Sequence, residues 1–142
     1  MPKSGPIIVI EDDIDDQELL DEVFKILNYP NQVIFFSDGY EALDYIEKTD
    51  VQPFLILSDI NMPKINGFEL RKKVLNNEEL KVKCIPYLFF TTGGNRKAVY
   101  DAYSMSAQGF FIKPTSIESL QNTIKKIVEY WKECFSPTQY IE

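Results

Sequence analysis

Five short apolar runs are spaced along the chain, and a longer segment with apolar residues at helical spacing separates each run from the next. The runs are Ile7 to Ile10, Val33 to Phe36, Phe54 to Leu57, Tyr87 to Phe90 and Phe110 to Ile112. Continuous apolar runs of this length are typical of strands buried on both faces of a parallel sheet. Strands that alternate with helices predict an α/β fold in which helices cover both faces of the sheet.

Five helices are predicted between and after these strands, because apolar residues recur there three and four positions apart. They are Leu19, Leu20, Val23, Phe24 and Leu27, then Leu43 and Ile46, then Leu70 and Val74, then Val99, Ala102 and Tyr103, and finally a stripe from Ile117 to Trp131. Ser116 is a candidate N-cap, which predicts the last helix over about residues 116 to 134. The polar stretch from Asn76 to Lys83 predicts a solvated loop.

We expect one domain over residues 6–134, followed by a short tail over residues 135–142 that is either frayed or packed against a neighbour. No repeat or Pro/Gly/Ser-rich linker interrupts the alternating pattern. The longest apolar runs are far shorter than a membrane span, and the first lies too close to acids for a signal peptide. The expected location is therefore cytoplasmic, without membrane binding.

The 142 residues carry a net charge of −7 and include no histidine. The missing residue type excludes His-assisted nucleophiles and His metal ligands. The acidic balance argues against nucleic-acid binding, which needs clustered Lys and Arg. Cys84 and Cys134 form no CxxC pair, so we interpret them as buried or semi-buried thiols in a reducing compartment.

The unusual polar residues directly follow the predicted strands. They are Glu11, Asp12 and Asp13 after the first strand, Ser58 to Asn61 after the third, Thr91 to Gly94 after the fourth, and Lys113 and Pro114 after the fifth. The carboxyl ends of parallel strands meet at one edge of the sheet, which is where ligands bind in such folds. Taken singly, each residue has a structural alternative as a helix cap, a turn residue or a strand end.

Taken together, three carboxylates at one edge would raise each other's pKa unless a cation compensates them. Oxygen ligands without histidine or thiolate favour Mg²⁺, which commonly bridges a carboxylate and a phosphoryl group. Lys113 would offer a charge and Thr91 a hydroxyl donor to such a group. The pattern therefore indicates phosphoryl transfer to a carboxylate.

Four motifs, IVIEDD, LSDINMPKINGFEL, FFTTG and GFFIKP, occur in this order along the chain. Together they resemble the receiver domains of two-component response regulators, over about residues 6 to 132. The resemblance implies a stand-alone receiver with a flavodoxin-like, doubly wound sheet of five parallel strands. Its strand order would be 2-1-3-4-5, with five helices in a three-layer sandwich.

The resemblance also implies a metal site and a phosphoacceptor. Asp59 would accept the phosphoryl group, and Asp12 and Asp59 would bind Mg²⁺ directly. The backbone carbonyl of Asn61 would be the third protein ligand, and Glu11 would act through water. Asp13 falls one place past the acidic pair and is expected to be a loop or helix-capping acid.

The remaining matched residues would respond to the phosphoryl group. Lys113 would pair with it, and a cis peptide bond between Lys113 and Pro114 would aim the lysine inward. Thr91 would be the switch hydroxyl. Phe110 matches an aromatic that follows the threonine inward, although a core aromatic that does not move is an equal interpretation. Thr92 is bulkier than the residue usual at its position and Gly93 has no side chain to orient water, so these two predict slow autodephosphorylation. Asn61 is the third residue expected to tune the lifetime of the phosphoryl group.

The implied function is a phosphorelay response regulator that changes a protein-interaction surface and catalyses only its own phosphorylation and dephosphorylation. A sensor histidine kinase or a histidine phosphotransfer protein would be the donor, and the output protein is unknown. Tyr100 and Tyr103 lie on the expected output face, where homodimer and kinase contacts are both open. The alternative is a phosphorylation-independent protein-binding pseudo-receiver. Phosphatases of the haloacid-dehalogenase type and flavodoxin-type cofactor binders fit the motifs less well.

Overall fold

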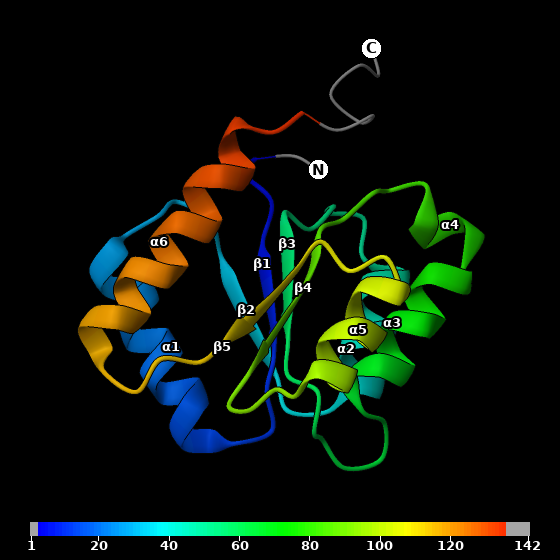
Figure 1. Ribbon diagram of the computed structural model, residues 1–142. Coiled ribbons are helices and arrows are strands. Elements are labelled where there is room, and N and C mark those ends of the chain that lie inside the picture. Colours follow the sequence, from blue (N-terminus) through cyan, green and yellow to red (C-terminus); the bar gives the residue numbers. More distant parts are fainter. Residues whose placement is uncertain (1–2, 136–142) are drawn as a thin grey trace.

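Five parallel strands run through the middle of the structure, a computed structural model that describes residues 3–135 (Figure 1). The strands are β1 (Ile7–Ile10), β2 (Val33–Phe36), β3 (Leu55–Ser58), β4 (Tyr87–Thr91) and β5 (Gly109–Ile112). Their order in the sheet is β2-β1-β3-β4-β5, as the sequence predicts. Each predicted strand is present to within a residue at each end, and the flavodoxin-like fold class is confirmed.

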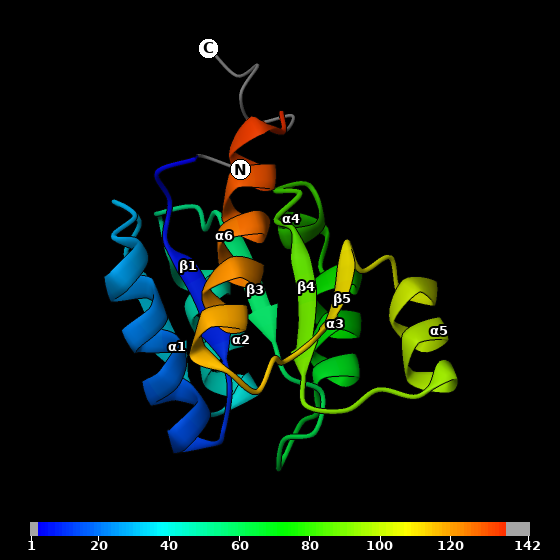
Figure 2. The same cartoon turned by 60° about the vertical axis from the view of Figure 1, so that its left-hand side comes forward.

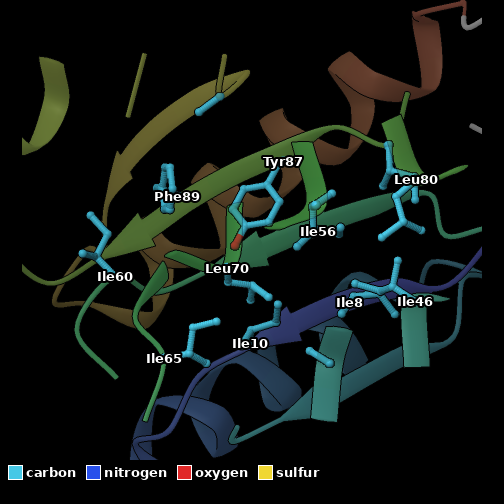
Figure 3. Close-up of a cluster of buried hydrophobic side chains, with 14 of the residues drawn as sticks. Ile8, Ile10, Ile46, Ile56, Ile60, Ile65, Leu70, Leu80, Tyr87 and Phe89 are labelled. Carbon is cyan, nitrogen blue, oxygen red and sulfur yellow. The ribbon is translucent and has the colours of Figure 1, made fainter. Parts of the chain in front are cut away.

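Helices cover both faces of the sheet, and the sheet separates two hydrophobic cores. The helices are α1 (Ile14–Leu27), α2 (Gly39–Lys48), α3 (Gly67–Asn76), α4 (Glu78–Lys81), α5 (Arg96–Ser104) and α6 (Ile117–Glu133). One core packs α1 and α6 against alternate residues of β1, β3 and β4. The other packs α2, α3 and α5 against the residues between them, and its side chains are drawn in Figure 3. This alternation explains why the central strands are apolar at every position except their last residues Ser58 and Thr91.

The segment from residue 76 to residue 83 differs from the predicted solvated loop, because it contains the single-turn helix α4. The side chain of Asn77 accepts hydrogen bonds from the backbone N–H groups of Glu79 and Leu80, which caps the turn. Leu80 is only 3% exposed and packs in the core beside α3. The charged stretch contains only two apolar residues, Leu80 and Val82, and their spacing does not predict a helical turn.

The two outer strands also differ from the prediction of burial on both faces. All four residues of β2 are half-buried, and Ile112 at the end of β5 is exposed. Both strands are at edges of the sheet, where one side has no neighbouring strand. Apolar content alone does not distinguish an edge strand from a central one.

Side-chain caps begin the helices that follow the carboxyl edge of the sheet. Asp13 caps α1, Asn66 and Glu69 form a capping box at α3, and Ser116 caps α6 as predicted. These caps satisfy backbone N–H groups that a helix leaves free at its start. They fix the loops that carry the candidate site.

Over residues 3–135, no helix has the length and apolar character that a membrane span requires. The expectation for the tail concerns residues 135–142, and all of these except Phe135 lie outside the described part of the chain.

Candidate functional site

Three carboxylates meet at the carboxyl edge of the sheet, at the lower side of the molecule in Figures 1 and 2. Glu11 and Asp12 follow β1, and Asp59 follows β3. One oxygen from each lies within 4.8 Å of the other two. Glu11 and Asp59 are buried, whereas Asp12 is exposed. The predicted acidic cluster is therefore brought together, with one side open to solvent.

Lys113 reaches this cluster from the end of β5. Its Nζ donates to Glu11, to Asp59 Oδ2 at 3.0 Å and to Asp16 Oδ2 at 2.9 Å. The side chain of Lys113 is only 8% exposed. An ammonium group has three N–H donors, so these three carboxylates use all of them. The sequence predicts that Lys113 lies near Asp59, and the structure places it there.

Asp16 is a site residue that the sequence interpretation missed. It is the third residue of α1, three positions after the N-cap Asp13. Side chains in a first turn point back toward the N-terminus of the helix, which here faces the end of β1. Its position in the first helical turn was the sequence feature that could have indicated that Asp16 belongs to the site. Asp13 itself caps α1, as expected, by accepting from the backbone N–H groups of Asp15 and Asp16.

The electrostatics of the site are dominated by excess negative charge. Burial raises the pKa of Glu11 from 4.5 to about 7, and the nearby charge of Asp59 adds to the rise while Lys113 opposes it. Burial alone would lower the pKa of Lys113, but its hydrogen bonds to Glu11, Asp16 and Asp59 hold that pKa above its usual value. Three carboxylates thus share one ammonium, and Asp12 adds a fourth carboxylate to the cluster. This arrangement favours a further cation.

The donor set fits a hard divalent cation. Within residues 3–135 the cluster offers carboxylate oxygens and neither histidine nor thiolate. Oxygen-only sets of this kind suit Mg²⁺ and Mn²⁺ rather than zinc or copper. Asn61, the residue expected to add a backbone carbonyl, is exposed two positions after Asp59.

Backbone contacts hold Asp59 tightly. Its Oδ1 accepts from the N–H of Ile60 at 2.7 Å, and its own N–H donates to the carbonyl of Ile10 at 3.0 Å. Gly67, the first residue of α3, donates to the Ile60 carbonyl at 2.8 Å. A Cβ at position 67 would lie 2.9 Å from Ile60 Cα and closer still to the Asp59 carbonyl oxygen. Only glycine lets α3 approach the loop this closely.

Thr91 ends β4 behind the cluster and is fully buried. Its hydroxyl has no hydrogen-bond partner among residues 3–135, although buried polar groups are nearly always paired. The backbone N–H of Lys113 donates to the Thr91 carbonyl at 2.7 Å, which ties the ends of β4 and β5 together. A buried hydroxyl is therefore available at the edge where the acids meet.

The other residues singled out in the sequence lie around this edge. Phe110 is half-buried with its ring 6.4 Å from that of Phe89, and a Cβ at Gly94 would lie 2.8 Å from the Phe110 ring. Thr92 and Gly93 are both exposed, and a Cβ at Gly93 would meet nothing within 4 Å. A side chain at position 93 would thus extend into open space.

The expected cis bond between Lys113 and Pro114 is wrong for this structure, since no peptide bond over residues 3–135 is cis. The trans form is the favoured one even before proline. Lys113 reaches Glu11 and Asp59 with this bond in the trans form.

The sequence of this chain matches a family model described as the response regulator receiver domain over residues 7–125. The chain belongs to the response regulator receiver family. Receiver domains are signalling domains of two-component systems. The chain is 30% identical over 129 residues to the probable methanogenesis regulatory protein FilR2 of Methanothrix harundinacea, and the match covers 88% of this chain and 82% of that protein.

Two solved structures of receivers have the same fold. The phosphorylated cyanobacterial phytochrome response regulator RcpA superposes with a TM-score of 0.83 at 26% identity, covering 94% of this chain and 98% of that one. The Mn²⁺-bound form of Rcp1, a response regulator of Synechocystis, has a TM-score of 0.79 at 27% identity, covering 94% and 97%. The receiver fold thus extends over nearly the whole chain.

Proposed function

We propose that this receiver accepts a phosphoryl group on Asp59 and thereby switches a protein-interaction surface in phosphorelay signalling. The observation that carries the proposal is the position of Lys113, whose ammonium lies 3.0 Å from Asp59 Oδ2 inside an acidic cluster. A histidine kinase or a histidine phosphotransfer protein would be the donor. The phosphorylated state of its relative RcpA supports the same chemistry here.

The transfer requires a carboxylate oxygen of Asp59 to form a bond to phosphorus. The donor's phosphorus–nitrogen bond breaks at the same time, and the leaving imidazole keeps the electron pair and takes a proton from water. The backbone N–H of Ile60 fixes one oxygen of Asp59, which restricts the orientation of the carboxylate. Lys113 supplies positive charge where the phosphoryl oxygens would lie.

Mg²⁺ would be held by Asp12, Asp59 and the backbone carbonyl of Asn61, with Glu11 acting through water. When bound, it would supply positive charge that neutralises the carboxylates and the phosphoryl oxygens. The oxygen-only cluster and the Mn²⁺-bound state of Rcp1 support this assignment. Phosphorylation without a divalent cation should accordingly be slow.

The hydroxyl of Thr91 would donate to the new phosphoryl oxygens, because it has no competing partner among the described residues. Its movement would reach Lys113 and β5 through the backbone hydrogen bond between Thr91 and Lys113. Phe110, whose ring lies against Gly94, would then be free to shift or would stay in the core. The output face would lie beside the exposed Tyr100 and Tyr103.

We assign the receiver to residues 6–134 and the tail to residues 135–142. The protein would lie in the cytoplasm and would have no nucleic-acid or membrane partner. It would catalyse no reaction beyond its own phosphorylation and dephosphorylation. An output protein and a homodimer are both compatible partners for the exposed aromatic residues of α5.

Incubation with Mg²⁺ and acetyl phosphate, followed by mass measurement of the intact protein, tests the phosphoacceptor. The wild type should gain one phosphate and Asp59→Asn should gain none. Asp50→Asn, which removes an exposed acid in the loop between α2 and β3, is the control and should behave as the wild type. Equal behaviour of wild type and Asp59→Asn would overturn the proposal and favour the pseudo-receiver.

The phosphate on Asp59 should be lost slowly from the wild type, because Gly93 has no side chain to orient a water molecule. Gly93→Glu should accelerate the loss, and the space around position 93 can accept the new side chain. Thr92→Ala should accelerate it through wider access. Time courses of phosphate loss after removal of acetyl phosphate measure both effects, and a wild type that loses phosphate within seconds contradicts the prediction.

A further inference from the structure

Lys113 is held by a carboxylate that lies outside the candidate cation cluster. Of its three partners, Glu11 and Asp59 belong to the group of acids whose oxygens lie within 4.8 Å of one another, and Asp16 does not. Asp16 extends from the first turn of α1, and its side chain is 31% exposed. The ammonium is therefore shared between the cluster and the helix.

The local structure keeps Asp16 in this position. The side chain of Asp13 accepts from the backbone N–H groups of Asp15 and Asp16, which fixes the first turn of α1. The side-chain amide of Gln17 donates to the carbonyl of Glu11, which joins that turn to the end of β1. The carboxylate of Asp16 thus faces Lys113 because two separate hydrogen-bonded links orient the turn.

The position of Asp16 changes how the positive charge of Lys113 is distributed. Without Asp16, the ammonium would compensate Glu11 and Asp59 alone, and these acids would attract a divalent cation less strongly. With Asp16 present, part of that charge is drawn toward α1. Charges at such short distances interact strongly in a partly buried site, where the effective dielectric constant is far below that of water.

We propose that Asp16 is a positioning residue for Lys113 that keeps the ammonium on the α1 side of the cluster, so that Glu11 and Asp59 remain available to a divalent cation. The inference rests on the proposed function, because it concerns the same cation. It assigns Asp16 no contact with the cation or the phosphoryl group. Its action is through Lys113 alone.

The test is calorimetric titration of the full chain with Mg²⁺, with no phosphodonor present. Asp16→Asn should weaken Mg²⁺ binding by about five- to tenfold, near the lower end of the losses seen when groups that orient metal ligands are removed. Asp15→Asn is the matched control, since it removes the same charge from an exposed residue of the same turn. The control should bind within about twofold of the wild type, because exposed charges are well screened.

Two further variants test whether Asp16 affects Mg²⁺ binding through Lys113. In a Lys113→Gln background, Asp16→Asn and Asp15→Asn should change the affinity for Mg²⁺ equally, because the group that Asp16 positions is gone. Asp16→Glu retains a carboxylate and should restore most of the affinity. Thermal unfolding of each variant checks that differences in binding do not arise from unfolding.

The outcomes separate this inference from the proposed function. If the wild type binds Mg²⁺ while Asp16→Asn matches Asp15→Asn, or binds Mg²⁺ more tightly than the wild type, the role of Asp16 is wrong and the cation site stands. If the difference between the two variants persists in the Lys113→Gln background, Asp16 does not act through Lys113. If the wild type binds no Mg²⁺, both the cation site and the role of Asp16 are overturned.

Discussion

Two cations, Lys113 and Arg71, are drawn into the interior of the protein, and their surroundings are opposite in kind. Lys113 donates to three carboxylates. Arg71 on α3 donates instead to two backbone carbonyls just after α5, those of Met105 at 3.0 Å and Ser106 at 2.8 Å. Its guanidinium also lies 5.3 Å from the centre of the Tyr87 ring. Neutral groups thus surround one cation and excess anions surround the other.

The contrast shows how charge separates a structural site from a reactive one. Burial lowers the pKa of Arg71, and its carbonyl and ring partners compensate the charge with dipoles that cannot titrate. The Arg71 site therefore joins α3 to the end of α5, and its hydrogen-bond partners include no carboxylate that could bind a divalent cation. The Lys113 site retains net negative charge and attracts a further cation. Mutations at the two sites should accordingly respond differently to Mg²⁺ and to pH.

The largest effect is expected from Arg71→Ala. The substitution removes two charge-assisted hydrogen bonds and leaves two part-buried carbonyls without donors, which should lower the free energy of unfolding by about 3 kcal/mol. Urea unfolding measures the loss, and Mg²⁺ should not restore it. Lys72→Ala, at an exposed position of the same helix, is the control and should change stability by less than about 0.5 kcal/mol. A similarly small loss for Arg71→Ala would show that its partners are readily satisfied by water.

A smaller effect is expected from Lys113→Gln, and it should depend on the divalent cation. With a chelator present, the substitution leaves Glu11, Asp16 and Asp59 without their ammonium and should lower the free energy of unfolding by about 2 kcal/mol. Mg²⁺ should restore more stability to this variant than it adds to the wild type, because the ion replaces the missing charge. If Mg²⁺ stabilises Lys113→Gln no more than Arg71→Ala, the proposed distinction between the two sites fails.

The smallest effect is expected from pH. The pKa of Glu11 is about 7 in the folded protein and near 4.5 when unfolded, so the folded state binds more protons between these values. Stability should therefore fall as pH rises through this range, by up to about 2 kcal/mol between about pH 5 and pH 7 with a chelator present. Glu11→Gln should remove this contribution, whereas Glu18→Gln, an exposed acid of α1, should leave it in place. An unchanged slope in Glu11→Gln would be the contrary result.

The same two sites show what the sequence could and could not reveal. Glu11, Asp12, Asp59 and Lys113 were predictable because each is an unusual residue directly after an apolar strand, where topology brings strand ends together. Arg71 could not be recognised, since its partners are backbone carbonyls that carry no residue-type signal. Its position in a charged stretch of α3 resembles that of the exposed Lys72 beside it.

Features that depend on the rotation of a helix about its axis, or on the order of strands in the sheet, could not be predicted from the sequence pattern either. Asp15 and Asp16 are adjacent acids in one helical turn, and only the rotation of α1 about its axis decides that Asp16 faces Lys113. The apolar runs of β2 and β5 were identified correctly as strands, but edge position depends on sheet order rather than on composition. Periodicity predicts elements well, whereas burial and side-chain partners require the assembled fold.

Gly67 has a consequence for moving this acceptor into another protein. The helix α3 touches the backbone of Asp59 and Ile60 at Gly67, and glycine alone permits that approach. A graft that copies Asp59 and its nearest neighbours, but places any side chain at the position of Gly67, would push the transplanted loop away from its sheet. Residues 59–67 should therefore be transferred as one unit, with the glycine as its far boundary.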